Sequence, residues 1–201
     1  MKKFLIIDGS SMLSTSYYGN LPKSVLFAKT DEEKEKHYSE ILRTSKGEYT
    51  NALFTMLRTL ISLYKKVKPD YVAVAFDVSR DTFRRTQLAE SYKANRKEAP
   101  APLKEQFIAM ENLLQKIGCQ VLMDKDYEAD DFAEKKKKKF ESPDLDTYVL
   151  TKDHDYFQLV SDYTRLWRVT DKEKVKDLQQ RYGLYAGKEG YDSLPAGIFE
   201  Y

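Results

Sequence analysis

Acidic side chains follow several apolar runs of this sequence, in a pattern that can bind metal ions. Asp8 and Asp77 directly follow two such runs, and Asp153 and Asp155 come shortly after another. Because the carboxyl ends of parallel strands meet at one edge of an α/β sheet, we expect these groups to lie at that edge. With an acidic motif further along the chain, the set of candidate ligands is Asp8, Asp77, Glu128, Asp130, Asp131, Asp153 and Asp155.

Carboxylates gathered at one place raise one another's pKa and destabilise the fold unless cations neutralise them. A site made only of oxygen ligands favours a hard ion, Mg²⁺ or Mn²⁺. Two such ions, roughly 3.5–4 Å apart, can stabilise both the attacking and the leaving oxygen of a phosphodiester. The acidic residues therefore predict two divalent metal ions and metal-assisted hydrolysis of a phosphodiester.

Each acidic residue also has a simpler interpretation. A single aspartate after a strand is usually a turn former or a helix N-cap, and Asp130 or Asp131 alone is more typical of a cap. Four independent groups at one edge favour the metal interpretation. The single cysteine and the two histidines of the sequence exclude an intramolecular disulfide and a Cys/His zinc cluster.

Short apolar runs and helical patterns alternate along the chain. The runs predict buried parallel strands at Phe4–Ile7, Tyr71–Phe76, Cys119–Leu122 and Thr147–Leu150. One helix is predicted over Asn51–Val67, with Thr50 as N-cap and an apolar face through Leu53, Met56, Leu57, Leu60, Ile61 and Tyr64. A second is predicted over Leu103–Ile117, with Phe107, Met110, Leu113 and Leu114 inward and Gly118 as its end. The expected fold class is α/β, a mainly parallel sheet flanked by helices.

The length of 201 residues and the 41% apolar content predict a single folded domain over residues 1–201. Within it we expect a polar, partly mobile excursion at about residues 20–46 and a connector at about 182–201. No apolar run reaches the length of a signal peptide core or a membrane span, so we expect a cytoplasmic protein without a membrane partner. No oligomer is predicted. The net charge of +2 does not by itself indicate a nucleic-acid partner.

A basic segment nevertheless runs from Arg84 to Lys104, with six Lys or Arg residues against two acidic ones. Beside an acidic metal centre it could neutralise phosphate oxygens, and Tyr92 could stack on an unpaired base. A solvated loop with a packed tyrosine accounts for the spacing equally well. The candidate nucleic-acid contacts are Arg84, Arg85, Tyr92, Lys93, Arg96 and Lys97.

The chain resembles the 5′ nuclease domain of bacterial DNA polymerase I, in the flap endonuclease family. The resemblance rests on blocks that occur in family order. They are Asp8-Gly9-Ser10-Ser11, Phe76-Asp77 with Thr82-Phe83-Arg84, Tyr92-Lys93-Ala94-Asn95-Arg96 with Pro102-Leu103 and Gln106, Glu128-Ala129-Asp130-Asp131, and residues 151–160.

This resemblance implies a PIN-like or resolvase-like fold and structure-specific cleavage of DNA near 5′ ends, flaps or nicks during replication and repair. It implies that Asp8, Asp77, Glu128 and Asp130 hold a first metal, and that Asp131, Asp153 and Asp155 serve a second. Lys93 and Arg96 would contact the scissile phosphate, and Arg84 is a further catalytic candidate. A fused or separate polymerase region is a possible partner.

The sequence departs from the family pattern at three places. Lys152 stands where the motif has glycine, and Lys135–Lys139 are five consecutive lysines on a predicted helix. No Gly-Asp…Ser-Asp-Asn-Pro stretch occurs, so we expect the chain to lack the C-terminal helix–hairpin–helix module. Two alternatives stay open: a non-catalytic fragment that binds branched DNA, and a PIN-like ribonuclease.

Overall fold

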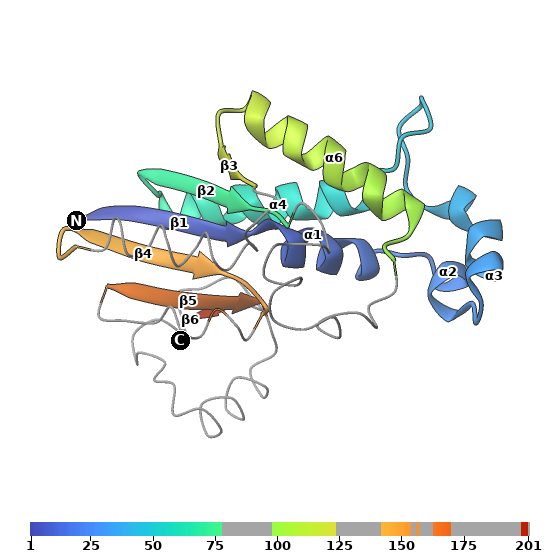
Figure 1. Ribbon diagram of the computed structural model, residues 1–201, viewed down its shortest axis with the longest axis horizontal. Helices are drawn as coiled ribbons and strands as arrows, with labels where there is room; N and C mark the ends of the chain where they lie inside the picture. The colour runs from blue at the N-terminus through green and yellow to red at the C-terminus, as the bar shows by residue number, and fades with distance from the viewer. Residues whose placement is uncertain (78–97, 124–141, 154–155, 157–162, 170–197, 201) are drawn as a thin grey trace, which may run out of the picture.

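The computed structural model describes residues 1–77, 98–123, 142–153, 156, 163–169 and 198–200. Their strands form one sheet in the order β3-β2-β1-β4-β5-β6 (Figure 1). Strands β1 to β5 are parallel and β6 is antiparallel to β5. The bounds are β1 Lys2–Asp8, β2 Tyr71–Ala75, β3 Gln120–Leu122, β4 Leu145–Leu150, β5 Thr164–Val169 and β6 Ile198–Glu200. The predicted α/β class with a mainly parallel sheet is confirmed.

The central strands are apolar on both faces. Leu5 and Ile7 of β1 face the helices, and Ile6, which alternates with them, is completely buried as well. Burial on both faces explains why β1, β2 and β4 occur as continuous apolar runs in the sequence. Strand β5 was not predicted because Arg165 interrupts its pattern. Arg165 is only half-buried, and its guanidinium pairs with Asp146 of β4 at 3.1 Å.

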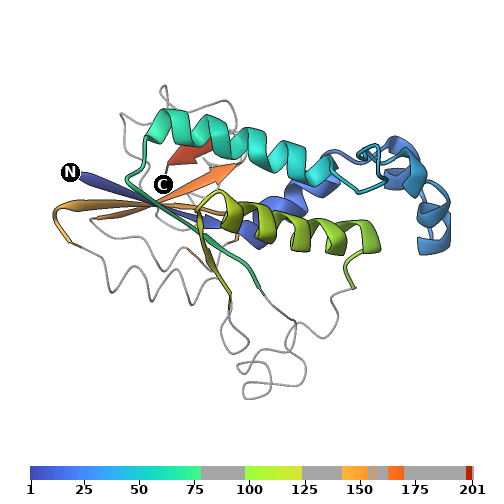
Figure 2. The ribbon, with the colours of Figure 1, turned by 90° about the horizontal axis from the view of Figure 1, so that it is seen from above.

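Three helices pack together against the sheet: α1 Gly9–Tyr18, α4 Asn51–Val67 and α6 Ala101–Lys116. Figure 2 shows α4 and α6 side by side over the strands. Both helices begin at the end of the sheet where β1 leads into α1. Helix α1 was not predicted. The core between these helices and the sheet includes Leu13 of α1, Met56 of α4 and Met110 of α6, each fully buried.

The bounds of α4 match the prediction, but its predicted apolar face is partly wrong. Ile61 and Tyr64 are more than half exposed, whereas Met56 is buried as predicted. Leu63 and Val67, which lie outside the predicted face, are buried as well. Apolar residues occur on almost every side of this helix, so spacings of three and four fit more than one face. Contact with α1 and α6 selects the buried face.

The ends of the helices also differ in detail from the predictions. Helix α6 begins at Ala101, two residues before the predicted start, because Pro102 fits the first turn of a helix. Gly118 ends it as expected, with a φ of 83°. Thr50 occupies the N-cap position of α4, but its hydroxyl donates to the carbonyl oxygen of Leu42 instead of capping the helix.

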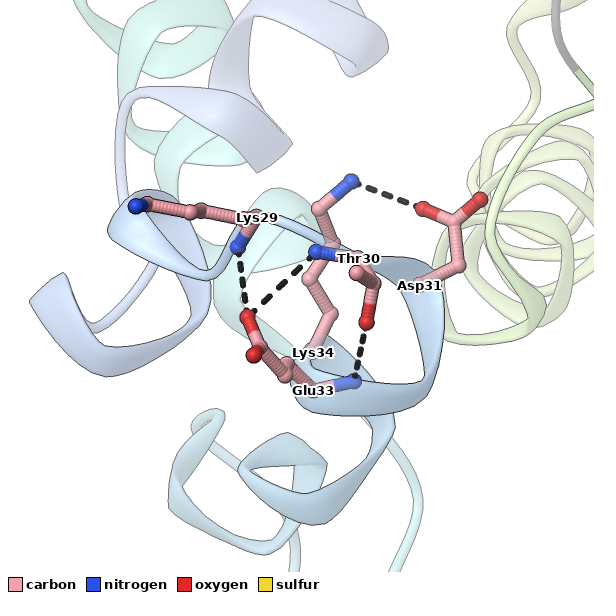
Figure 3. Close-up of polar contacts among 5 residues, drawn as sticks. All are labelled: Lys29, Thr30, Asp31, Glu33 and Lys34. Atoms are coloured by element: carbon pink, nitrogen blue, oxygen red, sulfur yellow. Dashed lines mark hydrogen bonds and ion pairs between the residues drawn. The ribbon is translucent and has the colours of Figure 1, made fainter.

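The polar segment at about residues 20–46 contains three short helices, α2 Lys23–Phe27, α3 Asp31–Lys36 and η1 Tyr38–Glu40. Helix α3 starts with a capping box, drawn in Figure 3. The Thr30 hydroxyl accepts from the N–H of Glu33 at 3.2 Å, and the Glu33 carboxylate accepts from the N–H groups of Lys29 and Thr30. Figure 1 shows α2 and α3 beyond the end of the sheet.

No helix in the described part of the chain has the length and apolar character that a membrane crossing requires.

Candidate metal centre

Asp8 is the last residue of β1 and also the N-cap residue of α1. Its Oδ1 atom accepts a hydrogen bond from the backbone N–H of Ser11 at 2.9 Å. The unpaired N–H groups and the dipole of a helix N-terminus favour a carboxylate there. The residue is only 4% exposed, although aspartate is rarely buried. The cap therefore fixes one oxygen of a buried carboxylate and leaves the other to a different partner.

Gly9 allows α1 to begin directly at the end of β1. A Cβ atom at this position would lie 2.7 Å from the ring of Phe76 and 2.8 Å from Cγ1 of Val74. With any other residue, the start of α1 or the side chains of Phe76 and Val74 would have to move. Glycine thus permits the close approach between the start of α1 and the end of β2.

Thr151, the first residue after β4, connects Asp8 to Asp153. Its hydroxyl donates to Oδ2 of Asp8 at 2.7 Å and accepts from the backbone N–H of Asp153 at 2.9 Å. Strands β1 and β4 pair in parallel with Ile7 opposite Leu150, so the residues that follow these two are neighbours. Parallel pairing thus brings together two residues that are 143 positions apart.

Asp77 lies two residues beyond β2 and is tied to the start of α1. Its backbone N–H donates to Oγ of Ser10 at 2.9 Å. The N–H of Phe76 donates to the carbonyl oxygen of Leu122, which extends the contact between β2 and β3 past the end of the strand. Asp77 and Asp153 are exposed, whereas Asp8 is buried.

Burial raises the pKa of Asp8 from 3.8 to about 7. The hydrogen bonds from Thr151 and Ser11 oppose this shift, and the negative charges of Asp77 and Asp153 add to it. Repulsion from both aspartates requires the three carboxylates to be close enough to interact. Near neutral pH, a cation at this position would remove the repulsion and stabilise the ionised form of Asp8.

The donor set fits a hard divalent cation. Each oxygen of Asp8 accepts one hydrogen bond from the protein, and an ionised carboxylate offers about four acceptor positions in all. Lone pairs therefore remain on both oxygens for a ligand. Asp77 and Asp153 would add further oxygen atoms, which Mg²⁺ and Mn²⁺ prefer as ligands.

A buried amide network fixes the helices next to this site. Oε1 of Gln106, which is completely buried in α6, accepts from the N–H groups of Ala52 at 2.8 Å and Leu53 at 3.3 Å. Its Nε2 donates to Oδ1 of Asn51 at 2.8 Å, and Nδ2 of Asn51 donates to the carbonyl oxygen of Tyr17. Gln106 thus caps α4 in place of Thr50 and links α4 and α6 to the end of α1.

Residues 3–183 match the family described as 5′-3′ exonuclease, N-terminal resolvase-like domain. The chain belongs to this family. The DNA polymerase I of Chloroflexus aurantiacus is 40% identical over 153 residues, which are 76% of this chain and 16% of the polymerase. The 5′-3′ exonuclease of Aquifex aeolicus is 35% identical over 162 residues, 81% of this chain and 49% of that protein. The chain thus spans half or less of the curated relatives that it matches.

Two solved structures share the exonuclease fold with this chain. The 5′-exonuclease of bacteriophage T5 with bound zinc ions has a TM-score of 0.56 and 18% identity, covering 91% of this chain and 62% of the T5 chain. A complex of the bacteriophage T5 flap endonuclease with DNA and metal ions has a TM-score of 0.55 and 18% identity, covering 91% and 61%. The predicted resemblance and the resolvase-like fold are confirmed.

The structure describes three of the residues predicted as metal ligands, and it brings them to one edge of the sheet: Asp8, Asp77 and Asp153. The described residues by themselves contain no group of three or more His, Cys, Asp or Glu that could hold a metal ion. The remaining predicted site residues lie outside the described residues. They are Glu128, Asp130, Asp131, Asp155, Arg84, Arg85, Tyr92, Lys93, Arg96 and Lys97, and Lys135–Lys139 lie outside as well.

The sequence analysis assigned no role to several polar residues that contact the predicted ligands or fix the helices packed on the sheet. Ser10, Thr151 and Gln106 all occur in the blocks that carry the resemblance, but only their acidic and basic neighbours were considered as functional. A threonine directly after an apolar strand is a weak signal. A role can be assigned to its hydroxyl only when the neighbouring strand is known to end in an aspartate.

Proposed function

We propose that this chain is the catalytic domain of a divalent-metal-dependent nuclease that hydrolyses DNA phosphodiesters near 5′ ends. The observation that carries the proposal is the buried Asp8 carboxylate at the carboxyl edge of the sheet, repelled by Asp77 and Asp153. Membership of the 5′-3′ exonuclease family supports the reaction class. The activity would be 5′–3′ exonuclease and flap endonuclease, in DNA replication and repair.

Asp8, Asp77 and Asp153 would bind the cation, together with Glu128, Asp130, Asp131 and Asp155 from the acidic motifs of the sequence. Two Mg²⁺ or Mn²⁺ ions are expected, in keeping with the metal ions bound to the T5 relatives. Such ions polarise the phosphoryl group and lower the pKa of a bound water. The protein's part is to hold the carboxylates at one edge through β1, β2 and β4.

The substrate would be DNA with a 5′ end, a flap or a nick. The basic segment from Arg84 to Lys104 would bind the phosphate backbone, with Lys93, Arg96 and Arg84 nearest the reacting phosphate. A relative crystallised with DNA supports a nucleic-acid substrate. The polymerases among the relatives suggest that a polymerase region, fused or separate, acts with this domain.

Cleavage of a 5′-flapped duplex in the presence of Mg²⁺ tests the function. We expect Asp8→Asn to reduce the cleavage rate by at least about a hundredfold, since charge stabilisation in the transition state contributes on this scale. Asp31→Asn is the matched control, because Asp31 is an exposed aspartate of α3 in an ion pair with Lys34. It should cleave like the wild type.

Three results would contradict the proposal or redirect it. Products that form equally with and without metal, or equally with Asp8→Asn, would overturn it. Salt-sensitive binding to branched DNA without turnover would favour the non-catalytic alternative. Cleavage confined to single-stranded RNA would favour the PIN-like ribonuclease.

A further inference from the structure

We infer that the hydroxyl of Thr151 is a positioning group that sets the orientation of the Asp8 carboxylate for cation binding. The inference rests on the proposed metal centre and adds to it a residue that is not itself a metal ligand. Ser10 has a related role at the backbone of Asp77.

The direction of the Thr151 hydrogen bonds carries the argument. The N–H of Asp153 can only donate, so Oγ1 of Thr151 acts as acceptor in that contact. The hydroxyl proton then points to Oδ2 of Asp8, which can only accept when ionised. One oxygen atom therefore fixes both a buried carboxylate and the turn that carries an exposed one.

Burial makes this arrangement specific. Thr151 is 3% exposed and Asp8 is 4% exposed, so water has little access to replace a lost partner. With Ser11 on Oδ1 and Thr151 on Oδ2, the plane of the Asp8 carboxylate is set from both sides. Partners that hydrogen-bond to a metal-binding carboxylate in this way typically change metal affinity 10–100-fold when they are removed.

The chain contains a matched control for this hydroxyl. Thr164 of β5 is completely buried, and its hydroxyl has no hydrogen-bond partner in the described part of the chain. Replacing either threonine with valine keeps the branched shape and removes the hydroxyl. Only the change at Thr151 removes hydrogen bonds to the site.

The test measures the dissociation constant of Mn²⁺ by calorimetry for the 201-residue chain and the variants Thr151→Val, Thr151→Ser and Thr164→Val. We expect Thr151→Val to weaken binding by roughly 10–100-fold. Thr151→Ser should stay close to the wild type because it retains the hydroxyl, and Thr164→Val should bind normally. Equal affinity of Thr151→Val and the wild type would overturn the inference, as would failure of serine to restore binding.

A second readout needs no metal. Hydrogen exchange at the Asp153 amide should accelerate in Thr151→Val and not in Thr164→Val, because only the first loses the acceptor for that N–H. Unchanged protection of this amide would contradict the positioning role.

Ser10 extends the test to the third carboxylate. Ser10→Ala removes the acceptor for the N–H of Asp77, whereas Ser11→Ala in the same turn retains the backbone N–H that caps Asp8. We expect weaker Mn²⁺ binding in Ser10→Ala than in Ser11→Ala. Equal affinities would confine the positioning role to Thr151.

The outcomes separate this inference from the proposed function. A wild-type chain that binds Mn²⁺ but does not cleave DNA would contradict the nuclease proposal and still allow the threonine variants to be compared. A wild-type chain that cleaves DNA, with unchanged Mn²⁺ affinity in Thr151→Val, would contradict the inference alone. A wild-type chain that binds no Mn²⁺ would overturn both.

Discussion

At the carboxyl ends of β1 and β4, polar side chains are buried and their hydrogen bonds join residues far apart in the chain. Thr151 contacts Asp8 across 143 positions, and Ser10 contacts Asp77 across 67. In the polar segment at residues 20–46, ion pairs and caps are exposed and join residues three or four positions apart. Both regions are rich in charge, but only the sheet edge keeps a carboxylate away from water. A cation can compensate for that burial, and the exposed pairs of the segment need no such compensation.

The largest effect is expected from pH, because Asp8 at the sheet edge is the only carboxylate in the described part of the chain whose pKa is strongly shifted. Between 3.8 and about 7, folded Asp8 retains a proton that the unfolded chain has lost. The free energy of unfolding of the metal-free protein should therefore decrease by a few kcal/mol as the pH rises through this range, at about 1.4 kcal/mol per pKa unit. Urea denaturation at several pH values measures the change.

Asp8→Asn isolates this contribution, since other groups titrate in both proteins. The difference in stability between wild type and variant should change across the range from pH 3.8 to about 7 and level off above it. An excess of Mg²⁺ should reduce the loss in the wild type alone. A difference in stability that stays constant with pH would mean that burial does not raise the pKa of Asp8.

A smaller effect is expected at Gln106. This residue is buried and contacts residues far away in the sequence, as the residues of the sheet edge do, but it lies farther from the carboxylates. Gln106→Leu leaves the N–H groups of Ala52 and Leu53 and the amide of Asn51 without their partner. Since an unsatisfied buried polar group costs about 1–3 kcal/mol, we expect a loss of that size by chemical denaturation. Gln120→Leu, at an exposed position, is the control. Equal losses would show that the network adds no stability.

The smallest effect is expected in the polar segment. Thr30→Ala removes the cap of α3, and such caps contribute about 1 kcal/mol to the helix that they start. Because α3 has no buried residue, we expect the global free energy of unfolding to fall by less than this amount. Mn²⁺ affinity should not change. A change in affinity would mean that the segment and the metal centre are coupled.

The same contrast separates what the sequence could predict from what it could not. The strands β1, β2 and β4, the bounds of α4 and the acidic residues at the strand ends followed from local patterns. The partners of those acids did not, because Thr151 and Ser10 meet Asp8 and Asp77 only through the pairing of parallel strands. Gln106 replaces Thr50 as the cap of α4 for the same reason. Local periodicity also failed at Ile61 and Tyr64, where packing between helices decides which face is buried.

We propose, as the central claim, that the carboxylates at the ends of β1, β2 and β4 contribute ligands to one cation site. Crystals of the chain grown with Mn²⁺ and measured at the manganese absorption edge test it most directly. We predict an anomalous peak within bonding distance of a carboxylate oxygen of Asp8, and the loss of this peak in Asp8→Asn. An ordered Asp8 carboxylate without manganese beside it, at saturating Mn²⁺ and neutral pH, would contradict the account.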